Sequence, residues 1–475
     1  MTLVETPALV RRTHHVLRPD ATRVVSTPFL PGEEIFGAGV SRRAAVLARL
    51  LALPDADVDA ALIDVLTRFS ARHGDLVGLL DARFALVAGQ LDHAGSLSLE
   101  RRRLIGACMS QEYAIESAAL FNPSLVAHPD QSGLPPGSTR FVMSVRGVGE
   151  GHVSCIELRT GVVDAADELT FDSPGPTTTV PSRDVTVHSR DDLRRQNDEL
   201  AGAREEADAL LRSLPEAFPP EAVAGTPRLE WLVACTYDVT FPADSPLDSR
   251  VLLPGSPAER NGIEDLRLVE VEYADGRRSY LGTYTAFDGE TVAPHLVATD
   301  DFGSFRMSRL SGAGAKNKGM ALFPRRVGGR YLALSRWDRE NNSLAGSTDL
   351  KHWDDLGTLS TPVHAWEIIQ AGNCGSPIET SAGWLVLTHG VGPMRQYGIG
   401  AMLLDLDDPR RVLGSLPMPL LTPAADERDG YVPNVVYSCG ALLHGDTLVL
   451  PYGCSDAAIR VALVDVPHLL ARLVG

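Results

Sequence analysis

The feature that most constrains the fold is a two-residue alternation of apolar and polar residues that begins near Phe121 and continues toward the C-terminus. This period is typical of β-strands with one buried face. Five segments share one form, an alternating apolar stretch that ends in functional groups: Arg140–Arg146, Arg278–Tyr284, Arg330–Arg336, Gly383–His389 and Asp446–Tyr452. The last four recur at intervals of roughly 50 to 60 residues, as propeller blades do. The pattern predicts a mainly β fold, a five-bladed β-propeller, with a β-sandwich as the alternative.

The N-terminal part follows a different period. Between Pro31 and Glu116 the apolar residues repeat at helical spacing, and in Asp57–His73 they fall on one face of a helix. This region carries no cluster of nucleophiles, bases or metal ligands, so we expect a structural unit or an oligomer contact. We predict an α-helical N-terminal extension over residues 1–118 and a propeller domain over residues 119–475.

A long gap separates the first two of these strands, and it predicts a loop and helix insertion at about residues 172–222. Phe171–Pro181 is rich in proline, serine and threonine, which is typical of a loop. Arg190–Ser213 is charged and then apolar, which indicates one exposed helix, and the prolines after it end that helix. Three interpretations remain open for this segment: a lid over a site, an oligomer contact, or a helix with no role beyond the surface.

Charge and composition exclude several classes of partner. The chain has 44 basic and 61 acidic residues, a net charge of −17, which argues against nucleic acid or an anionic membrane as a partner. No apolar run reaches the roughly 18 residues of a membrane span, and we expect no leader segment. The six cysteines are scattered without close pairs, as expected of free thiols in the cytoplasm. The histidines and carboxylates lack the spacing of zinc or calcium ligands, so we expect no metal and no cofactor.

The stretch Glu259–Leu268 carries adjacent carboxylates, Glu264 and Asp265, at the mouth of a strand. Arg267 points to the same side as Asp265 in a regular strand, and this combination suits acid–base chemistry on a polar substrate. A surface ion pair at the start of a strand is the alternative interpretation.

In a propeller the inner strand ends of distant blades meet around one channel. The strand ends here supply carboxylates for sugar hydroxyls and proton transfer, and basic groups for an anion. They are Arg146, Asp288, Arg336, His389 and Asp456, together with Lys318 in the loop Ala313–Gly319. We therefore expect a carbohydrate-active protein, with a non-catalytic glycan-binding propeller as a remote alternative.

Eight short motifs follow one another in a fixed order from Phe121 onward. They are Phe121–Ser124, Gly262–Arg267, Tyr284–Gly289, Asn317–Pro324, Trp366–Glu367, Gly383–Gly390, Leu403–Pro409 and Tyr452–Asp456. In this order they resemble glycoside hydrolase family 130, which contains β-mannoside phosphorylases and mannosidases. The helical extension and the insertion resemble those of a longer branch of the family. The resemblance implies a five-bladed propeller and an inverting cleavage of β-mannosidic bonds in β-linked manno-oligosaccharides.

The resemblance also implies roles for individual residues. Asp265 corresponds to the proton donor, which acts through a hydroxyl of the bound mannose. Glu264 is the candidate for keeping Asp265 protonated, although adjacent residues of a regular strand face opposite sides. Substrate-binding positions fall on Asn122, Arg146, Arg267, Asp288 and Asp456.

The attacking group is the open point of the resemblance. Lys318, His389 and Tyr397 resemble phosphate ligands, but no arginine follows the Tyr284–Ala286 segment, and Arg336 or His295 is the candidate replacement. We expect phosphorolysis, with inorganic phosphate as co-substrate and mannose 1-phosphate as product. The alternative is inverting hydrolysis by an exo-β-mannosidase, for example on β-1,2 linkages, with Glu340 or Glu367 activating water.

Overall fold

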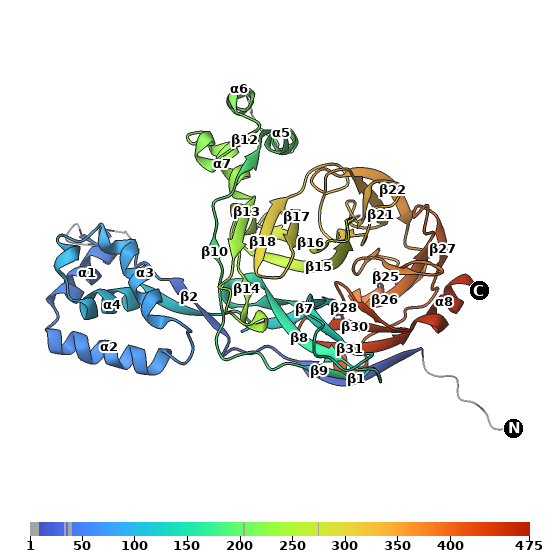
Figure 1. Cartoon of the computed structure of the whole chain (residues 1–475), viewed down its shortest axis with the longest axis horizontal. Coiled ribbons are helices and arrows are strands. Elements are labelled where there is room, and N and C mark those ends of the chain that lie inside the picture. Colours follow the sequence, from blue (N-terminus) through green and yellow to red (C-terminus); the bar gives the residue numbers. More distant parts are fainter. Residues whose placement is uncertain (1–8, 33–34, 37–39, 203–204, 274) are drawn as a thin grey trace. The chain divides into compact units, whose positions relative to one another are not determined.

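The computed structural model describes residues 9–32, 35–36, 40–202, 205–273 and 275–475 (Figure 1). The chain forms two compact units. The larger unit contains the chain up to Pro19 together with Ala118–Pro174 and Pro181–Gly475, and the smaller one contains Asp20–Ser117 and Gly175–Val180. In the described residues no helix is long and apolar enough to cross a membrane, and no group of three metal-ligating side chains occurs.

The smaller unit is helical over most of the range from Pro31 to Glu116 where the 3.6-residue period predicts it, but Ser110–Ala114 at the end of that range forms a strand. Its elements are α1 (Arg42–Ala52), α2 (Asp55–Phe69), α3 (Leu76–Ala88) and α4 (Leu99–Cys108), with β2 (Val24–Pro28) paired to β5 (Ser110–Ala114) and β3 (Ile35–Phe36) paired to β4 (Val40–Ser41). Ser98 caps α4 by accepting a hydrogen bond from the backbone of Arg101. A Cβ on Gly106 of α4 would lie 2.0 Å from the carbonyl oxygen of Leu80. The close packing of α3 on α4 therefore requires glycine at this position.

The larger unit is built from antiparallel sheets. In Figure 1 they follow the chain from teal to red, except that the dark blue β1 lies beside β31. The first sheet has the order β10 (Ser182–Arg183), β13 (Tyr237–Thr240), β18 (Ser304–Arg309), β17 (Val292–Thr299), β16 (Arg278–Phe287), β15 (Gly262–Glu272), β8 (Ser154–Val163), β7 (Thr139–Val148) and β6 (Ala119–Ala127), with β9 (Leu169–Phe171) and β14 (Val251–Leu252) on β8. β15 meets β8 only through the parallel pair of Gly262 and Ser154. This sheet therefore consists of two antiparallel halves that a single backbone pair joins.

Three further sheets follow. The second sheet has the order β19 (Ala321–Leu322), β20 (Tyr331–Ser335), β21 (Asn342–Ser347) and β22 (Asp354–Ser360). The third has the order β23 (Gln370–Asn373), β25 (Gly383–Val391), β26 (Tyr397–Leu404) and β27 (Val412–Ser415), with β24 (Ile378–Thr380) on β25. The fourth has the order β1 (Val10–Leu17), β31 (Ala458–Asp465), β30 (Thr447–Cys454) and β28 (Val436–Tyr437), with β29 (Leu442–His444) on β30. The chain ends in α8 (Val466–Val474). The five strands predicted from the alternation are confirmed as β7, β16, β20, β25 and β30.

Apolar cores join each group of strands to the next. One buried core lies between strands β6–β8 and β15–β18, and a second lies between β15–β17 and β19–β21. A third core lies between β20–β21 and β25–β26, and a fourth lies between β25–β26 and β30–β31. A further core joins the last sheet back to the first group, because Phe141 and Met143 of β7 pack with Val461 of β31. The hydrophobic faces of the strands are therefore buried between neighbouring sheets, and the polar side chains at the strand ends are the ones that can form a binding site.

Residues 10–17 correct the prediction of a helical extension over residues 1–118, because they form β1, which pairs with β31. The two strands are more than 400 residues apart in the chain, so local periodicity contains no signal for their pairing.

The insertion also differs from its prediction of one helix at about residues 172–222. It contains α5 (Arg190–Glu199), α6 (Glu205–Ser213), α7 (Pro227–Ala234) and the pair of β11 (His188–Ser189) with β12 (Ala217–Phe218), and it has its own apolar core. The prolines predicted to end the helix, Pro215, Pro219 and Pro220, do follow the end of α6 at Ser213. Helix α7 was not predicted; Pro227 occupies its first turn, where the missing N–H has no intrahelical partner to lose.

Candidate functional site

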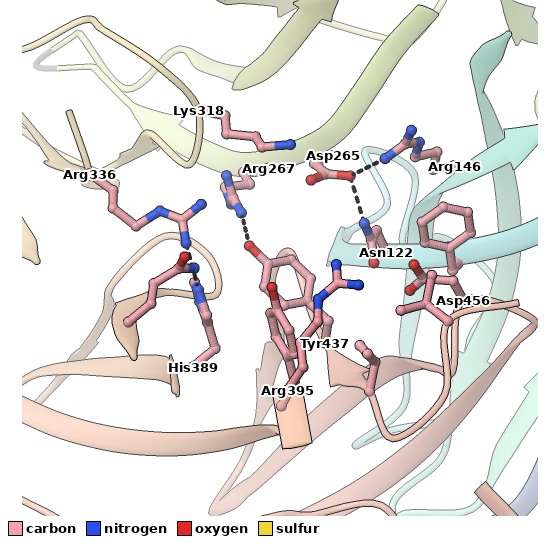
Figure 2. A pocket seen from close by; sticks show the side chains of 15 residues that line it. Asn122, Arg146, Asp265, Arg267, Lys318, Arg336, His389, Arg395, Tyr437 and Asp456 are labelled. Atoms are coloured by element: carbon pink, nitrogen blue, oxygen red, sulfur yellow. Dashed lines mark hydrogen bonds and ion pairs between the residues drawn. The ribbon is translucent and has the colours of Figure 1, made fainter. Parts of the chain in front are cut away.

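A cavity of about 160 Å³ in the larger unit collects charged side chains from strands that are distant in the chain (Figure 2). Its lining includes nine of the residues singled out in the sequence: Asn122, Arg146, Asp265, Arg267, Lys318, Arg336, His389, Tyr397 and Asp456. Phe121, Gln370, Arg395, Val432, Val435 and Tyr437 complete it. Most of these residues lie at or just beyond the end of a strand.

A β-bulge positions the two adjacent carboxylates of β15. The register with β16 breaks between Glu264 and Arg267, and Asp265 has a left-handed backbone with φ of 56°. A bulge changes the direction of the side chains that follow it. Arg146 consequently contacts both carboxylates, with 2.8 Å from Nη2 to Oε1 of Glu264 and 3.2 Å from Nη1 to Oδ1 of Asp265. Glu264 does not line the cavity itself; it lies beside Asp265, bound to the same arginine.

The same backbone device recurs at two other positions of the site. Asn122 has φ of 50° at a bulge of β6, and Asp456 has φ of 51° in the turn between β30 and β31. The side-chain amide of Asn122 donates to Oδ1 of Asp265 at 2.6 Å. A left-handed conformation costs about 1 to 2 kcal/mol in most residues, and such conformations gather where function needs a particular side-chain direction.

The two carboxylates of the cavity titrate differently. Burial by itself would raise the pKa of Asp265, but the charges of Arg146, Lys318 and Arg267 and the hydrogen bond from Asn122 lower it to about 2. Burial and the negative charge of Asp265 raise the pKa of Asp456 to about 6. These neighbours therefore favour the ionised form of Asp265. The expectation that Glu264 keeps Asp265 protonated does not hold, because Arg146 and Lys318 both pair with Glu264 and offset its negative charge.

His389 is a neutral side chain with both nitrogens engaged. Its Nε2 accepts a hydrogen bond from Nη1 of Arg336 at 2.8 Å, and its Nδ1 lies 3.2 Å from the carbonyl oxygen of Asn373. Arginine only donates, so Nδ1 carries the proton of the ring. Burial and the charges of Arg336 and Arg267 hold the pKa of His389 well below its usual value. His389 therefore orients Arg336.

Arg267 is held in a similar way by a residue that sequence reasoning missed. Its Nη2 donates to the hydroxyl of Tyr437 at 2.6 Å, and its Nε donates to the carbonyl oxygen of Cys374 at 3.2 Å. Tyr437 lies in the two-residue strand β28. So short a strand has no periodicity that would reveal it in the sequence.

The cavity carries an excess of positive charge. Its lining contains Arg146, Arg267, Lys318, Arg336 and Arg395 but only two carboxylates, Asp265 and Asp456. The chain as a whole has a net charge of −17. A local cluster of cations in an acidic protein is suited to an anionic ligand.

Asp288 lies outside this cavity, which corrects the expectation that it binds the substrate. Of the two candidates for the missing arginine, Arg336 lines the cavity and His295 does not. Oδ1 of Asp288 accepts hydrogen bonds from the backbone of Glu290 at 2.9 Å and Thr291 at 2.7 Å, so this carboxylate caps the turn between β16 and β17. His295 is fully buried, and its ring packs against Tyr284. A carboxylate that caps a turn and one that faces a cavity both follow a strand, so sequence position does not separate them.

The two carboxylates assigned to hydrolysis are also absent from the lining. Glu367 accepts hydrogen bonds from the backbone of Val363 and His364 at 3.3 Å each, and Glu340 is exposed in a turn.

Comparisons with known proteins show which proteins this chain is similar to. The glycoside hydrolase 130 family model, described as β-1,4-mannooligosaccharide phosphorylase, matches residues 244–473. A 1,2-β-oligomannan phosphorylase of Thermoanaerobacter sp. (strain X514) is 33% identical over 232 residues, which cover 47% of this chain and 75% of that protein. A β-1,2-mannobiose phosphorylase of Listeria innocua is 33% identical over 232 residues, covering 47% of this chain and 63% of that protein.

A solved structure is similar as well. The β-1,2-mannobiose phosphorylase from Listeria innocua in complex with β-1,2-mannobiose has a TM-score of 0.47 and 24% identity, covering 76% of this chain and 93% of that one. The family match contains Asp265, Lys318, Arg336, His389 and Asp456. Asn122 and Arg146 lie before it, so the structure adds them to the group by proximity.

Proposed function

This chain belongs to glycoside hydrolase family 130, and from that membership we propose that it is an enzyme that cleaves β-mannosidic bonds in manno-oligosaccharides by phosphorolysis. Inorganic phosphate is the co-substrate and mannose 1-phosphate the product. The observation that carries the proposal is the excess of cations over carboxylates in the cavity. Phosphate is a dianion near neutral pH, and arginine and lysine are the side chains that bind it.

We propose further that residues 119–475 form a five-bladed β-propeller catalytic domain. Five antiparallel groups of strands support this, because the first sheet divides at the single pair of Gly262 and Ser154. The apolar cores that join each group to the next, and the last back to the first, also support it. A propeller brings strand ends from all blades to one channel, which accounts for a site assembled from residues 121 to 456.

In the proposed reaction a phosphate oxygen attacks the anomeric carbon of the mannose on the face opposite the departing glycosidic oxygen, which inverts the configuration. Asp265 supplies the proton to that oxygen through a hydroxyl of the mannose. The attacking hydrogen phosphate loses its own proton as it forms mannose 1-phosphate. That proton replaces the one that Asp265 gives up, so Asp265 ends the reaction in its starting state. Asn122, Arg146, Arg267 and Asp456 bind the sugar.

The low pKa of Asp265 constrains the order of these events. Lys318 and Arg146 are among the causes that keep Asp265 ionised. A phosphate dianion near Lys318 and Arg336 offsets part of that positive potential and raises the pKa of Asp265. The proposed acid therefore gains its proton more readily when the nucleophile is bound.

The test is to incubate the protein with β-1,2- and β-1,4-mannobiose, each with and without inorganic phosphate, and to separate the products by anion-exchange chromatography. We expect mannose 1-phosphate to form only with phosphate present. Cleavage at equal rates in both conditions, with free mannose as the product, would refute phosphorolysis and support inverting hydrolysis. The matched control is Asp265→Asn, which should lower the activity by about 10² to 10⁴ in all conditions.

A further inference from the structure

Arg395 lies in a strained turn that directs its side chain into the cavity. The turn joins β25 to β26, and Met394 and Arg395 are consecutive non-glycine residues with left-handed backbones, φ of 58° and 55°. Each such conformation costs about 1 to 2 kcal/mol, so two in succession persist only where the surroundings impose them. The backbone N–H of Gly392 donates to the carbonyl of Gln396 at 3.0 Å, which closes the turn. Figure 2 shows Arg395 reaching into the space between Tyr437 and Asn122.

The other arginines of the cavity already donate to partners within the protein. Arg146 is bound to Glu264 and Asp265, Arg267 to Tyr437, and Arg336 to His389. Among the described residues none forms a hydrogen bond or an ion pair with the Arg395 guanidinium, which is exposed at the mouth of the cavity. All five of its N–H donors are available to a ligand.

The hairpin that carries Arg395 also organises the cationic end of the cavity. His389 of β25 fixes Arg336, and Tyr397 of β26 lies with its ring parallel to that of His389, the centroids 6.2 Å apart. Arg395 stands between these two residues in the chain and lines the same cavity. One hairpin therefore presents a guanidinium directly and positions a second through a histidine.

Resting on the function proposed above, we propose that Arg395 binds the phosphate co-substrate and completes its site together with Lys318 and Arg336. A guanidinium offers two parallel N–H donors that match two oxygens of one phosphate. The other acceptors in this cavity are sugar hydroxyls and the carboxylate of Asp456, whose pKa the charge of Arg395 lowers. A role of Arg395 on that sugar side would show as a change in the KM for mannobiose, and this is the outcome that would overturn the assignment.

The test compares Arg395→Ala and Arg395→Lys with the control Arg339→Ala. Arg339 is also an exposed arginine with a left-handed backbone, φ of 73°, but it does not line the cavity. Initial rates are measured with phosphate varied at saturating mannobiose, and with mannobiose varied at saturating phosphate. We expect Arg395→Ala to raise the KM for phosphate by about 10- to 100-fold, because the loss of a hydrogen bond to a charged group weakens binding by about that factor. The KM for mannobiose should change less than about twofold. Arg395→Lys should fall between, and Arg339→Ala should match the wild type.

An unchanged KM for phosphate in Arg395→Ala, or a rise confined to mannobiose, would overturn the assignment while leaving phosphorolysis intact. Calorimetric titration of each protein with inorganic phosphate separates the two proposals. If the wild type shows no phosphorolysis but binds phosphate, and Arg395→Ala does not, the proposed reaction fails and the anion site stands. If the wild type does not bind phosphate, both fail.

Discussion

Replacing Asp456 by asparagine should stabilise the protein at neutral pH while it impairs function. The pKa of Asp456 is raised from 3.8 to about 6, first by burial and then by the charge of Asp265. A raised pKa means that the folded state disfavours the ionised form. The wild type therefore loses stability as the pH rises from about 4 to about 6, and the asparagine variant does not.

The size of the effect follows from that shift. A difference of about 2 pKa units at about 1.4 kcal/mol per unit gives about 3 kcal/mol, and partial exposure of the side chain reduces this to about 2 to 3 kcal/mol. The unfolding entropy is about 2.1 cal/mol/K per residue, or about 0.8 kcal/mol per degree for a unit of roughly 370 residues. Asp456→Asn should therefore raise Tm by about 2.5 to 4 °C at pH 8 and leave it unchanged at pH 4.

Differential scanning calorimetry at pH 4, 6 and 8 measures this directly, and Asp288→Asn is the matched control. Burial alone would raise the pKa of Asp288, but hydrogen bonds from the backbone of Thr291 and Glu290 lower it. Its replacement should lower Tm at pH 8 and leave the phosphorolysis rate near that of the wild type, because Asp288 lies outside the cavity. Asp456→Asn should instead lose activity. A variant at Asp456 that is no more stable than the wild type at pH 8 would refute the reasoning.

Three further outcomes are expected. Asp265→Asn should reduce the rate of phosphorolysis by about 10² to 10⁴, the contribution of a general acid, and a loss below tenfold in steady-state assays would argue against this role. His389→Leu should raise the KM for phosphate about 10- to 100-fold, because Arg336 loses its hydrogen-bond acceptor. His389→Gln keeps an acceptor and should raise this KM less. An equal rise in both variants would contradict the positioning role of His389. Glu259→Ala should lower Tm by at least about 4 °C without changing either KM, because two tyrosine hydroxyls and two backbone N–H groups donate to this buried carboxylate, and calorimetry with kinetics on the same sample checks it.

Much of the larger unit could be predicted from its sequence because its cause is local. The strands β7, β16, β20, β25 and β30 alternate apolar and polar residues, and burial of one face requires that pattern wherever the strand lies. The helices α1 to α4 of the smaller unit follow from their 3.6-residue period in the same way. The pairing of β1 with β31 could not be predicted, since neither strand encodes its distant partner.

At the site, the sequence by itself determined which chemical groups were available, namely carboxylates and cations at the ends of strands. Only the tertiary structure decided which of them act together. Glu264 lies beside Asp265 because a left-handed residue breaks the alternation of β15, while Asp288 turns back to its own loop. Arg395 and Tyr437 enter the site from segments without regular periodicity. The reason is physical: strand propensity depends on neighbours along the chain, whereas the direction of a side chain depends on single backbone angles and on register with distant strands.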